Sequence, residues 1–392
     1  MFIQLRNIIL FVVSVISVNA FDQGYEWEEL PNFPGLSRDD AIAFSIGELI
    51  YVGSGNHGGF SQSNQFYALD TDLNSWSQIA EFPGVRRQYA RGETVNGKGY
   101  LIGGIDPFNN PLNDIWEYDP QSNTWKELTV FPGGERWQAA SFVIEDKIYF
   151  GTGRDLDKRF ADFWRFNIAT NEWEELNDLP KLPCYETVSF SIFDKGYLGL
   201  GRDCTGVFLS DFWMYDPMND SWKQETDFPG GARYYSKGES YNGFGFVGTG
   251  EDEFGMMKDD IWEFDPFTQA WTEILGFPGV KQRGVASTAI PNKGVYYICG
   301  LSDSFTRLNT VYHLFNESQI NPYFKYDLDQ THNILRIRNI NVGAPIQVFS
   351  LNGELVFESI DHADNLLIHT NSWSRGMYVL HHNNQSEKIM LY

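Results

Sequence analysis

Short apolar segments separated by turn residues recur along this chain. One copy contains four of them in a row, "QYARGETV", "YLIGGID", "DIWEYD" and "TWKEL", and a tight "NGKG" turn joins the first two. Apolar runs of this length, some of them alternating with polar residues and bounded by Gly, Asn or Asp, are typical of β-strands. Each copy therefore predicts a small antiparallel sheet of four strands.

A tryptophan in the fourth strand marks the period of the repeat, which is 48 or 49 residues. The marker residues are Trp27, Trp76, Trp125, Trp173, Trp222 and Trp271. Four short strands per unit at this spacing indicate the blades of a propeller. Trp27 precedes the first complete unit, and Val311–Phe315 has no tryptophan strand after it. We therefore expect the strand around Tyr25–Leu30 to complete the last blade, which removes the open edge of the ring.

The repeats resemble kelch repeats over about Tyr25–Phe315. The marks are paired glycines after an apolar strand, as in Gly103-Gly104, and the Tyr-Asp-Pro…Trp spacing that begins at Tyr118 and ends at Trp125. The resemblance implies a six-bladed β-propeller, in which the recurrent Trp and Tyr residues pack the blades.

The two ends of the chain differ from the repeats. Residues 1–20 have a basic start, a short apolar run and a small-residue cleavage site, which are typical of a signal peptide. After a linker at 316–325, residues 326–392 contain short strands with polar turns that predict a small β-sandwich. The predicted fold is all-β: a six-bladed kelch β-propeller at 21–315, followed by a small C-terminal β-sandwich.

The tail also resembles the C-terminal sorting domain of the type IX secretion system of Bacteroidetes. The marks are Asn321-Pro322, then "IQVFSLNGELV", then "SRGMYVLHHNNQSEKIMLY" at the end of the chain. The resemblance implies that the secretion machinery is a partner of the tail, and that the protein is secreted or held at the outer-membrane surface. The tail histidines are interpreted as solvated strand residues.

Composition excludes some functions. The formal net charge is −23, which argues against sequence-independent binding of nucleic acid, because that binding needs Lys and Arg to replace counterions. Beyond the signal peptide no segment is apolar enough to cross a bilayer, so we expect no transmembrane segment in the mature chain. Small acidic ligands should bind only where local arginines override the overall field.

An arginine follows most Phe-Pro-Gly motifs, and an aspartate follows the Gly-rich second strand of the same repeat. If each hairpin turns at its Asn-Gly or equivalent pair, the arginine faces that aspartate across the strands. The sixth pair is out of register by one residue. The pairs are Arg87 with Asp106, Arg136 with Asp155, Arg233 with Asp252, and Arg283 with Asp303.

These pairs have two interpretations. They are structural ion pairs, or they ring the mouth of the central channel and bind a ligand together with His57, Trp137, Tyr185 and Tyr234. Guanidinium forks and aromatic faces suit carboxylated or hydroxyl-rich ligands such as sugars. For the mouth as a whole we predict ligand binding.

Blade four departs from the pattern because Cys184 replaces the arginine and Cys204 lies near it on the opposite strand. We expect either a disulfide between them, formed in an oxidising exterior, or two small buried thiols. Cys299 lies in a core strand and is interpreted as packing. The three cysteines have no zinc spacing.

The innermost strands carry small residues, as close approach at the axis requires, but two of them also carry charges. Arg91 and Glu93 lie in blade two, and Lys237 and Glu239 lie in the opposed blade five. Burial of unpaired charges is costly, so these groups should pair with one another or reach water in the channel.

Kelch propellers include a copper enzyme, galactose oxidase, and a bacterial sialic acid epimerase. Copper oxidase chemistry is unfavoured because the only repeat-region histidines, His57 and His313, lie in different strands. No catalytic residue, metal ligand or cofactor-binding motif is identified. The prediction is a secreted or cell-surface binding module for a glycan or a protein, and the alternative is a sugar-active enzyme similar to the epimerase.

Overall fold

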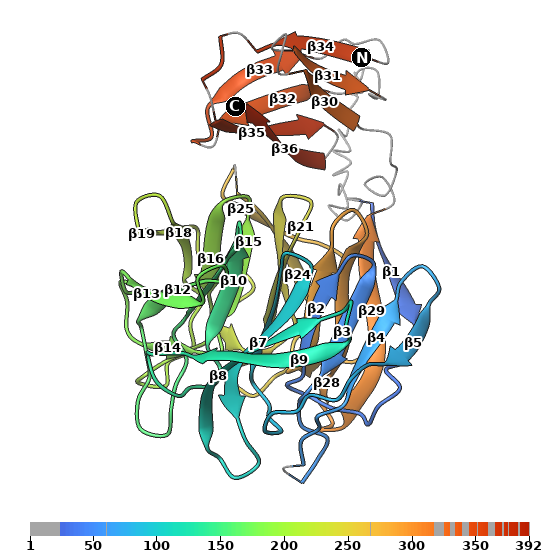
Figure 1. The fold of residues 1–392 in the computed structure, drawn as a ribbon, viewed down its shortest axis with the longest axis vertical. Helices are drawn as coiled ribbons and strands as arrows, with labels where there is room; N and C mark the ends of the chain where they lie inside the picture. Colours follow the sequence, from blue (N-terminus) through green and yellow to red (C-terminus); the bar gives the residue numbers. More distant parts are fainter. Residues whose placement is uncertain are drawn as a thin grey trace, which may run out of the picture.

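The computed structural model describes residues 24–59, 61–266, 268–316, 325–329, 334–338, 345–350, 352–359, 365–370, 372–374, 376–382 and 385–391. The described residues form β-strands and turns. They contain no helix that is long and apolar enough to cross a membrane. The expected signal peptide and most of the expected linker lie outside these residues. Six small sheets stand side by side in the N-terminal part, and the C-terminal strands form a further unit, red in Figure 1.

Each of the six sheets is an antiparallel blade built around four main strands. In blades 1 to 5, the order of these strands in the chain is also their order from the axis outward. Blade 1 consists of β2 (Ile42–Ile46), β3 (Leu49–Gly53), β4 (Phe66–Asp70) and β5 (Ser75–Gln78). Blade 2 consists of β6 (Arg91–Val95), β7 (Lys98–Ile105), β8 (Pro111–Asp119) and β9 (Thr124–Val130). Blade 3 consists of β10 (Ala140–Ile144), β11 (Lys147–Gly151), β12 (Phe163–Asn167) and β13 (Glu172–Leu176).

Blades 4 and 5 each add a two-residue ladder at the start of the inner hairpin. Blade 4 consists of β15 (Val188–Ile192), β16 (Lys195–Gly199), β18 (Phe212–Asp216) and β19 (Ser221–Gln224), with the ladder β14 (Cys184–Tyr185) and β17 (Arg202–Asp203). Blade 5 consists of β21 (Lys237–Tyr241), β22 (Phe244–Gly248), β24 (Ile261–Asp265) and β25 (Ala270–Glu273), with the ladder β20 (Arg233–Tyr234) and β23 (Glu251–Asp252).

Blade 6 closes the ring with a strand from the other end of the propeller. It consists of β26 (Gln282–Arg283), β27 (Ala286–Ile290), β28 (Gly294–Ser302), β29 (Arg307–Asn316) and β1 (Tyr25–Leu30). β1 pairs with β29 from Tyr25 opposite Asn316 to Leu30 opposite Val311, as the position of Trp27 predicts. The closure joins the first and last blades by backbone hydrogen bonds and leaves no unpaired strand edge between them.

Aromatic residues fill the space between neighbouring blades. The Phe131 ring, from a Phe-Pro-Gly motif, packs edge-on against Trp164 and Trp173, with ring centroids 5.6 and 4.8 Å apart. Phe142 at the inner end stacks on Tyr149. Equivalent residues pack in the same way in other blades, so the recurrent aromatics have the structural role that the repeat predicts.

A buried arginine joins the first three strands of blades 2, 3 and 5. In blade 3, Arg136 is fully buried and donates to the Thr152 carbonyl at 3.1 Å and to the Asp162 carboxylate at 2.6 Å. Its guanidinium lies 4.6 Å from the centre of the Phe131 ring. The same carboxylate accepts a hydrogen bond from Trp164 Nε1 at 2.9 Å. We call this set of contacts the arginine latch.

The equivalent contacts in the other blades keep the third-strand carboxylate, and the cation that bonds it differs in blade 4. In blade 2, Arg87 bonds Asp114, and in blade 5, Arg233 bonds Asp260, each at 2.5 Å. Blade 4 has Cys184 in place of the arginine, and Lys181 reaches the equivalent carboxylate, Asp211, at 2.8 Å. In blades 2 to 5 the acceptor is therefore the aspartate carboxylate of an Asp-x-Trp motif just before or within the start of the third strand.

The predicted ion pairs with the hairpin aspartates are wrong, although the backbone register is right in blades 2, 3 and 5. Arg233 is directly opposite Asp252, as predicted. The guanidinium groups turn inward to the third strand, whereas the hairpin aspartates accept hydrogen bonds from their own loops. Asp106, for example, accepts from the Phe108 and Asn110 N–H groups at 2.8 Å. Asp155 and Asp252 do the same.

The predicted register of blade 6 is also wrong. Arg283 is opposite Leu301, and the Asp303 N–H instead donates to the Lys281 carbonyl. Gln282 takes the latch position in this blade and is buried. Arg283 is displaced by one residue and faces blade 5, where its Nε lies 2.9 Å from the Glu251 carboxylate.

The C-terminal unit contains seven strands in two sheets. One sheet has the order β30 (Lys325–Asp329), β31 (Ile334–Arg338) and β34 (Asn365–His369). The other has the order β33 (Leu355–Ser359), β32 (Ile346–Ser350), β35 (Gly376–His382) and β36 (Gln385–Leu391). Buried residues from both sheets, including Leu335, Val348 and Ile389, form one core. This is the small sandwich that the tail predicts.

We expect Asp162→Ala to destabilise the protein by about 3–5 kcal/mol, because it leaves the buried Arg136 charge without its ionic partner. The matched control is Asp155→Ala in the same blade, which removes only hydrogen bonds within an exposed loop. It should cost about 1 kcal/mol or less. Urea unfolding of both variants measures the difference, and equal losses would contradict the latch.

Candidate functional site

Six equivalent residues surround the axis where the chain enters the innermost strands. They share a left-handed backbone, with φ between 54° and 60°, which L-residues adopt at a cost. We call them the gate ring, and its members are Asp40, Tyr89, Gln138, Glu186, Tyr235 and Gly284. A Cβ at Gly284 would lie 2.6 Å from the Asp40 carboxylate, so a glycine is needed where Asp40 occupies the space.

Two tyrosines of the gate ring meet across the channel. Tyr89 belongs to blade 2 and Tyr235 to the opposed blade 5, and their hydroxyl oxygens lie 3.3 Å apart. Their rings are nearly parallel, with centroids 6.1 Å apart. Gln138 Nε2 also lies 3.4 Å from the Tyr235 hydroxyl. These contacts narrow the channel at the level of the mouth.

The two carboxyl groups of the gate ring are shielded from solvent. Burial raises the pKa of Glu186 to about 7 and raises the pKa of Asp40 well above its usual value, where the nearby Asp39 charge adds to the effect. A cavity of about 30 Å³ lies beside them. Glu186 Oε1 and Gln138 Oε1 are buried acceptors without a hydrogen-bond partner within the described residues. The gate ring thus carries polar groups with unused hydrogen-bonding capacity.

Three arginines lie between blades 3, 4 and 5 at the mouth, and we call them the arginine belt. Arg154 is sandwiched between the rings of Trp137 and Tyr185, 4.7 and 4.8 Å from their centres. Arg159 lies 5.6 Å from the Tyr185 ring on the other strand of the same loop. Stacking on aromatic faces leaves the N–H edges of a guanidinium free to donate in its plane.

The third arginine lies one blade further on, against two rings that contact each other edge-to-face. Arg202 lies 4.8 Å from the Phe208 ring and 5.4 Å from the Tyr234 ring of blade 5. Its Nη2 donates to the Gly206 carbonyl at 3.3 Å. Arg202 therefore places a third guanidinium at the mouth, next to the pair from blade 3.

The belt lacks ionic partners. Among the described residues, no carboxylate lies within 4 Å of Arg154, Arg159 or Arg202, whereas Arg283 and Arg307 at the same face pair with Glu251 and Asp39. The chain as a whole has a net charge of −23. Unpaired guanidinium groups in an acidic protein form a local positive patch, and such groups bind carboxylates or phosphates.

The structure therefore divides the predicted site residues into two groups. Trp137, Tyr185 and Tyr234 lie in or beside the belt, and Arg283 stacks on the gate tyrosine Tyr235 at 4.3 Å. Latch residues Arg87, Arg136 and Arg233 are fully buried and are not available to a ligand. The aspartates Asp106, Asp155 and Asp252 hold their own loops, the Asp303 N–H donates to the Lys281 carbonyl, and His57 contacts Ser61 in blade 1.

Apolar side chains project from the mouth loops, outside the belt. Ten of the exposed large apolar residues lie in these loops, and the turns of the opposite face contribute two, Leu73 and Met218. Five of the ten recur after the second strand of successive blades. We call the ten the apolar crown: Leu36, Val85, Phe108, Leu156, Leu182, Val207, Phe254, Met256, Val280 and Phe305.

The expected disulfide between Cys184 and Cys204 is not formed, and both thiols are free. Cys184 is directly opposite Asp203, so Cys204 is opposite Pro183 and its side chain points to the other face of the ladder. Cys184 is buried in the blade core and Cys204 is exposed. Burial raises the pKa of the Cys184 thiol to about 11, so this group is an inert packing residue.

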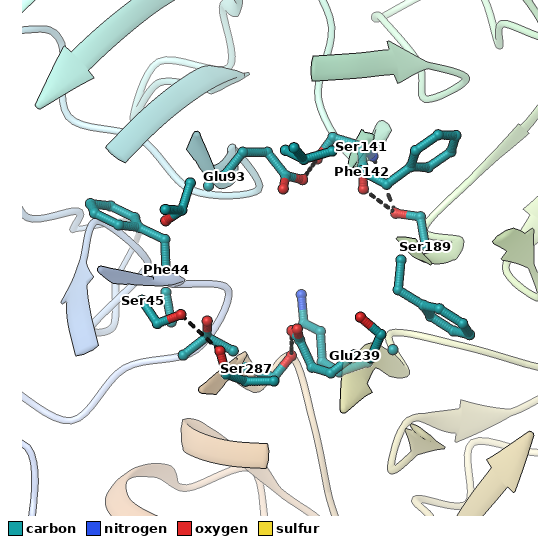
Figure 2. A pocket seen from close by; sticks show the side chains of 18 of the residues that line it. Phe44, Ser45, Glu93, Ser141, Phe142, Ser189, Glu239 and Ser287 are labelled. Atoms are coloured by element: carbon teal, nitrogen blue, oxygen red, sulfur yellow. Dashed lines mark hydrogen bonds between the residues drawn. The ribbon is translucent and has the colours of Figure 1, made fainter. Parts of the chain in front are cut away.

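The four charged residues of the innermost strands line the channel without forming ion pairs with one another. The Glu93 carboxylate accepts a hydrogen bond from Ser141, and the Glu239 carboxylate accepts one from Ser287 at 2.6 Å. Arg91 donates to Ser189 at 2.5 Å. Figure 2 shows Glu93 and Glu239 on opposite sides of the channel. The expected mutual pairing is therefore wrong, and the alternative that these groups reach the channel is right.

These features define a β-propeller of six blades whose mouth carries unpaired arginines. A family model described as the KLHDC2/KLHL20/DRC7 Kelch-repeats domain matches residues 23–199. No curated protein matches the sequence.

Among solved structures, 516 chains match. One of them is the structure of YjhT, which is 17% identical, with a TM-score of 0.63, over 73% of this chain and 99% of that chain. At this identity the likeness establishes the fold alone.

The belt, the crown and the Asp-x-Trp acceptors were missed by sequence reasoning. Asp-x-Trp recurs at Asp114, Asp162, Asp211 and Asp260 and could have been found as a periodic signal. The loop-tip apolar residues also recur at a fixed place in the repeat. The belt arginines have no such signal, because Arg154 and Arg202 occupy equivalent positions in only two blades.

The channel carboxyls predict an unusual pH dependence. Burial raises the pKa of Glu239 to about 7 from a model-peptide value near 4.5. Between about pH 4.5 and pH 7, the folded protein holds a proton that the unfolded chain has released, so stability should fall as the pH rises. Each such carboxyl contributes at most about 3 kcal/mol.

The test compares the wild type with Glu239→Gln, which keeps an acceptor for Ser287. Urea unfolding at pH 5 and pH 8 should show a smaller loss of stability between these two values in the variant. An unchanged difference would mean that Glu239 titrates normally in the folded protein.

Proposed function

We propose that the propeller is a binding module whose mouth face recognises a protein that presents acidic groups beside apolar side chains. The arginine belt supplies donors for carboxylates, and the apolar crown supplies the surrounding contact area. The observation that carries the proposal is the concentration of both features on one face, whereas the described residues of the opposite face include two exposed large apolar side chains. Exposed apolar patches rimmed by polar groups are typical of protein interaction sites.

The apolar crown and the arginine belt of the mouth face have different roles in the proposed binding. Burial of aromatic and aliphatic tips such as Phe254 and Phe305, which are 80% and 71% exposed, would supply hydrophobic stabilisation. Arginines packed against aromatic rings lose little conformational freedom when they bind a carboxylate, because the rings restrict the guanidinium before the partner arrives. The crown then contributes affinity, and the belt contributes orientation and selectivity for acidic partners.

A second candidate is a carboxylated sugar, either bound or acted on at the mouth. The specific observation that favours it is Glu186, a gate-ring carboxyl with a pKa of about 7 that could exchange a proton near neutral pH. Its arginine and tyrosine neighbours suit an acidic sugar. This candidate predicts faster interconversion of sugar anomers by NMR when purified protein is added.

We expect Phe254→Ser and Arg202→Gln each to weaken capture of cell-surface proteins by about tenfold or more, because each removes a contact typical of interface hot spots. Met218→Ser is the matched control, since Met218 is also 80% exposed but lies on the opposite face. Quantitative pull-down followed by mass spectrometry measures the captured partners.

Capture that survives both mouth variants would refute the proposal. A glycan-array signal that depends on Arg202 and not on Phe254 would support the carboxylated sugar instead. Partner binding through the belt should also weaken with added salt, because the Arg–carboxylate contacts are partly exposed to solvent.

For the C-terminal sandwich, we propose that it serves as a sorting domain read by the type IX secretion machinery, so that the propeller acts outside the cell. What supports this is its own packed core, distinct from the blade cores, together with the resemblance of its sequence.

Transfer of residues 317–392 to a reporter that carries a signal peptide should move the reporter to the cell surface or medium in a host with that machinery. The same reporter without the tail should stay in the periplasm. Cell fractionation distinguishes the two, and periplasmic retention of both reporters would reject the proposal.

A further inference from the structure

A cavity lies in the channel of the propeller, behind the gate ring. It has a volume of about 670 Å³ and is lined by the innermost strands of all six blades and by the β2–β3 and β27–β28 turns, at Gly47 and Asn292. It therefore opens on the face opposite the mouth, and Tyr89 and Tyr235 meet at its inner end. A volume of this size suits a small molecule.

The charges of the cavity are arranged in two layers along the channel. Arg91 and Lys237 form the layer near the gate ring, and Glu93 and Glu239 lie two residues further along the same strands, nearer the opening. Two residues of a strand span about 7 Å. In the outer layer, Glu93 and Glu239 lie on opposite sides of the channel (Figure 2). In the inner layer, the Arg91 side chain extends from blade 2 to Ser189 of blade 4, the blade next to that of Lys237.

The inner layer has unused donors. Lys237 lines the cavity, and its ammonium has no hydrogen bond or ion pair within the described residues. Arg91 Nη2 donates to Ser189, but its Nε is buried and has no partner within the same residues. The free ammonium of Lys237, with the Arg91 guanidinium as a second cation at the closed end of the cavity, forms a site for an anionic group.

The outer layer has fixed acceptors. Ser141 and Ser287, both from the next blade, hold the Glu93 and Glu239 carboxylates against the wall. One hydroxyl satisfies only part of the accepting capacity of a carboxylate, which has four lone-pair sites. The remaining capacity faces the channel and suits an ammonium group.

We propose that the channel cavity is a second ligand site, which binds a small zwitterion with its carboxylate between Lys237 and Arg91 and its ammonium between Glu93 and Glu239. The separation of the layers favours charges at the two ends of a chain, as in an ω-amino acid of roughly four to six carbon atoms. The site is independent of the proposed mouth function, because the gate tyrosines separate the two regions.

Competing occupants are distinguished by their charge. A simple anion would use only the inner layer, and a simple amine only the outer layer. A zwitterion satisfies both layers and leaves the net charge of the channel unchanged, so it avoids the cost of adding an uncompensated charge to a region with little solvent.

Calorimetric titration of the purified full-length protein with 6-aminohexanoate tests the proposal. We expect saturable binding with one molecule per chain, and at least tenfold weaker binding of hexanoate and hexylamine, which are matched ligands that each lack one charge. This comparison needs no variant and is unaffected by any folding defect. Equal binding of hexanoate or of hexylamine would overturn the proposal, as would no binding of 6-aminohexanoate at millimolar concentration.

Variants then locate the site. Lys237→Met should abolish 6-aminohexanoate binding and Glu239→Gln should weaken it at least tenfold, with thermal unfolding to confirm that each variant is folded. Arg202→Gln at the mouth is the control and should leave the affinity unchanged. Loss of binding in the Arg202 variant with full retention in a folded Lys237 variant would place the ligand at the mouth and reject the channel site.

Discussion

The buried guanidinium of the arginine latch is the constraint on which the mouth face depends. A fully buried arginine is tolerated only when its charge and its donors are satisfied, and here one group bonds a second-strand carbonyl, a third-strand carboxylate and an aromatic face. These contacts fix where the chain turns into the innermost strand. Arg136 and its equivalents are therefore structural, and the surface of the mouth is formed by the residues that follow them.

Three consecutive residues at this turn have three different roles. In blade 3, Arg136 points into its own blade, Trp137 stacks on Arg154 of the same blade, and Gln138 points towards the axis. The left-handed backbone at Gln138 makes the turn possible. A similar division in blades 2, 3 and 5 gives latch contacts within the blade, contacts at the mouth and contacts at the axis, so variation at one of the three positions leaves the other two intact. This is how a regular scaffold can carry an irregular surface.

Much of the fold follows from the sequence, because the repeat encodes it many times. Strand order, blade number and ring closure depend on patterns averaged over six copies, and the hairpin register follows from the turns in blades 2, 3 and 5. Register places Cα atoms opposite one another, but it does not say where a long side chain ends. Arg233 and Asp252 are directly opposed, yet the guanidinium bonds Asp260 on another strand.

The cysteines show a related limit that the register itself could have exposed. Cys184 is opposite Asp203, and side chains of adjacent residues on a strand point to opposite faces. Two cysteines at neighbouring positions on paired strands are therefore not enough for a disulfide, because its geometry requires Cβ atoms that point towards each other. The belt arginines were beyond reach for a different reason: they break the repeat, so that only packing between particular neighbouring blades reveals them.

The departures from symmetry are what give this propeller its chemistry. Apolar or small residues at the channel positions of blades 1, 3, 4 and 6 continue the packing, whereas blades 2 and 5 place Arg91, Glu93, Lys237 and Glu239 there. The same two blades supply the tyrosines that meet at the gate. Only opposed blades have side chains that face each other directly across the axis. Charges on one such pair of blades therefore face the same part of the channel. A charge on neighbouring blades would instead be drawn into the interface between them, as happens to Arg283 and Glu251. The position of a charge around the ring thus decides whether it packs a blade interface or lines the channel.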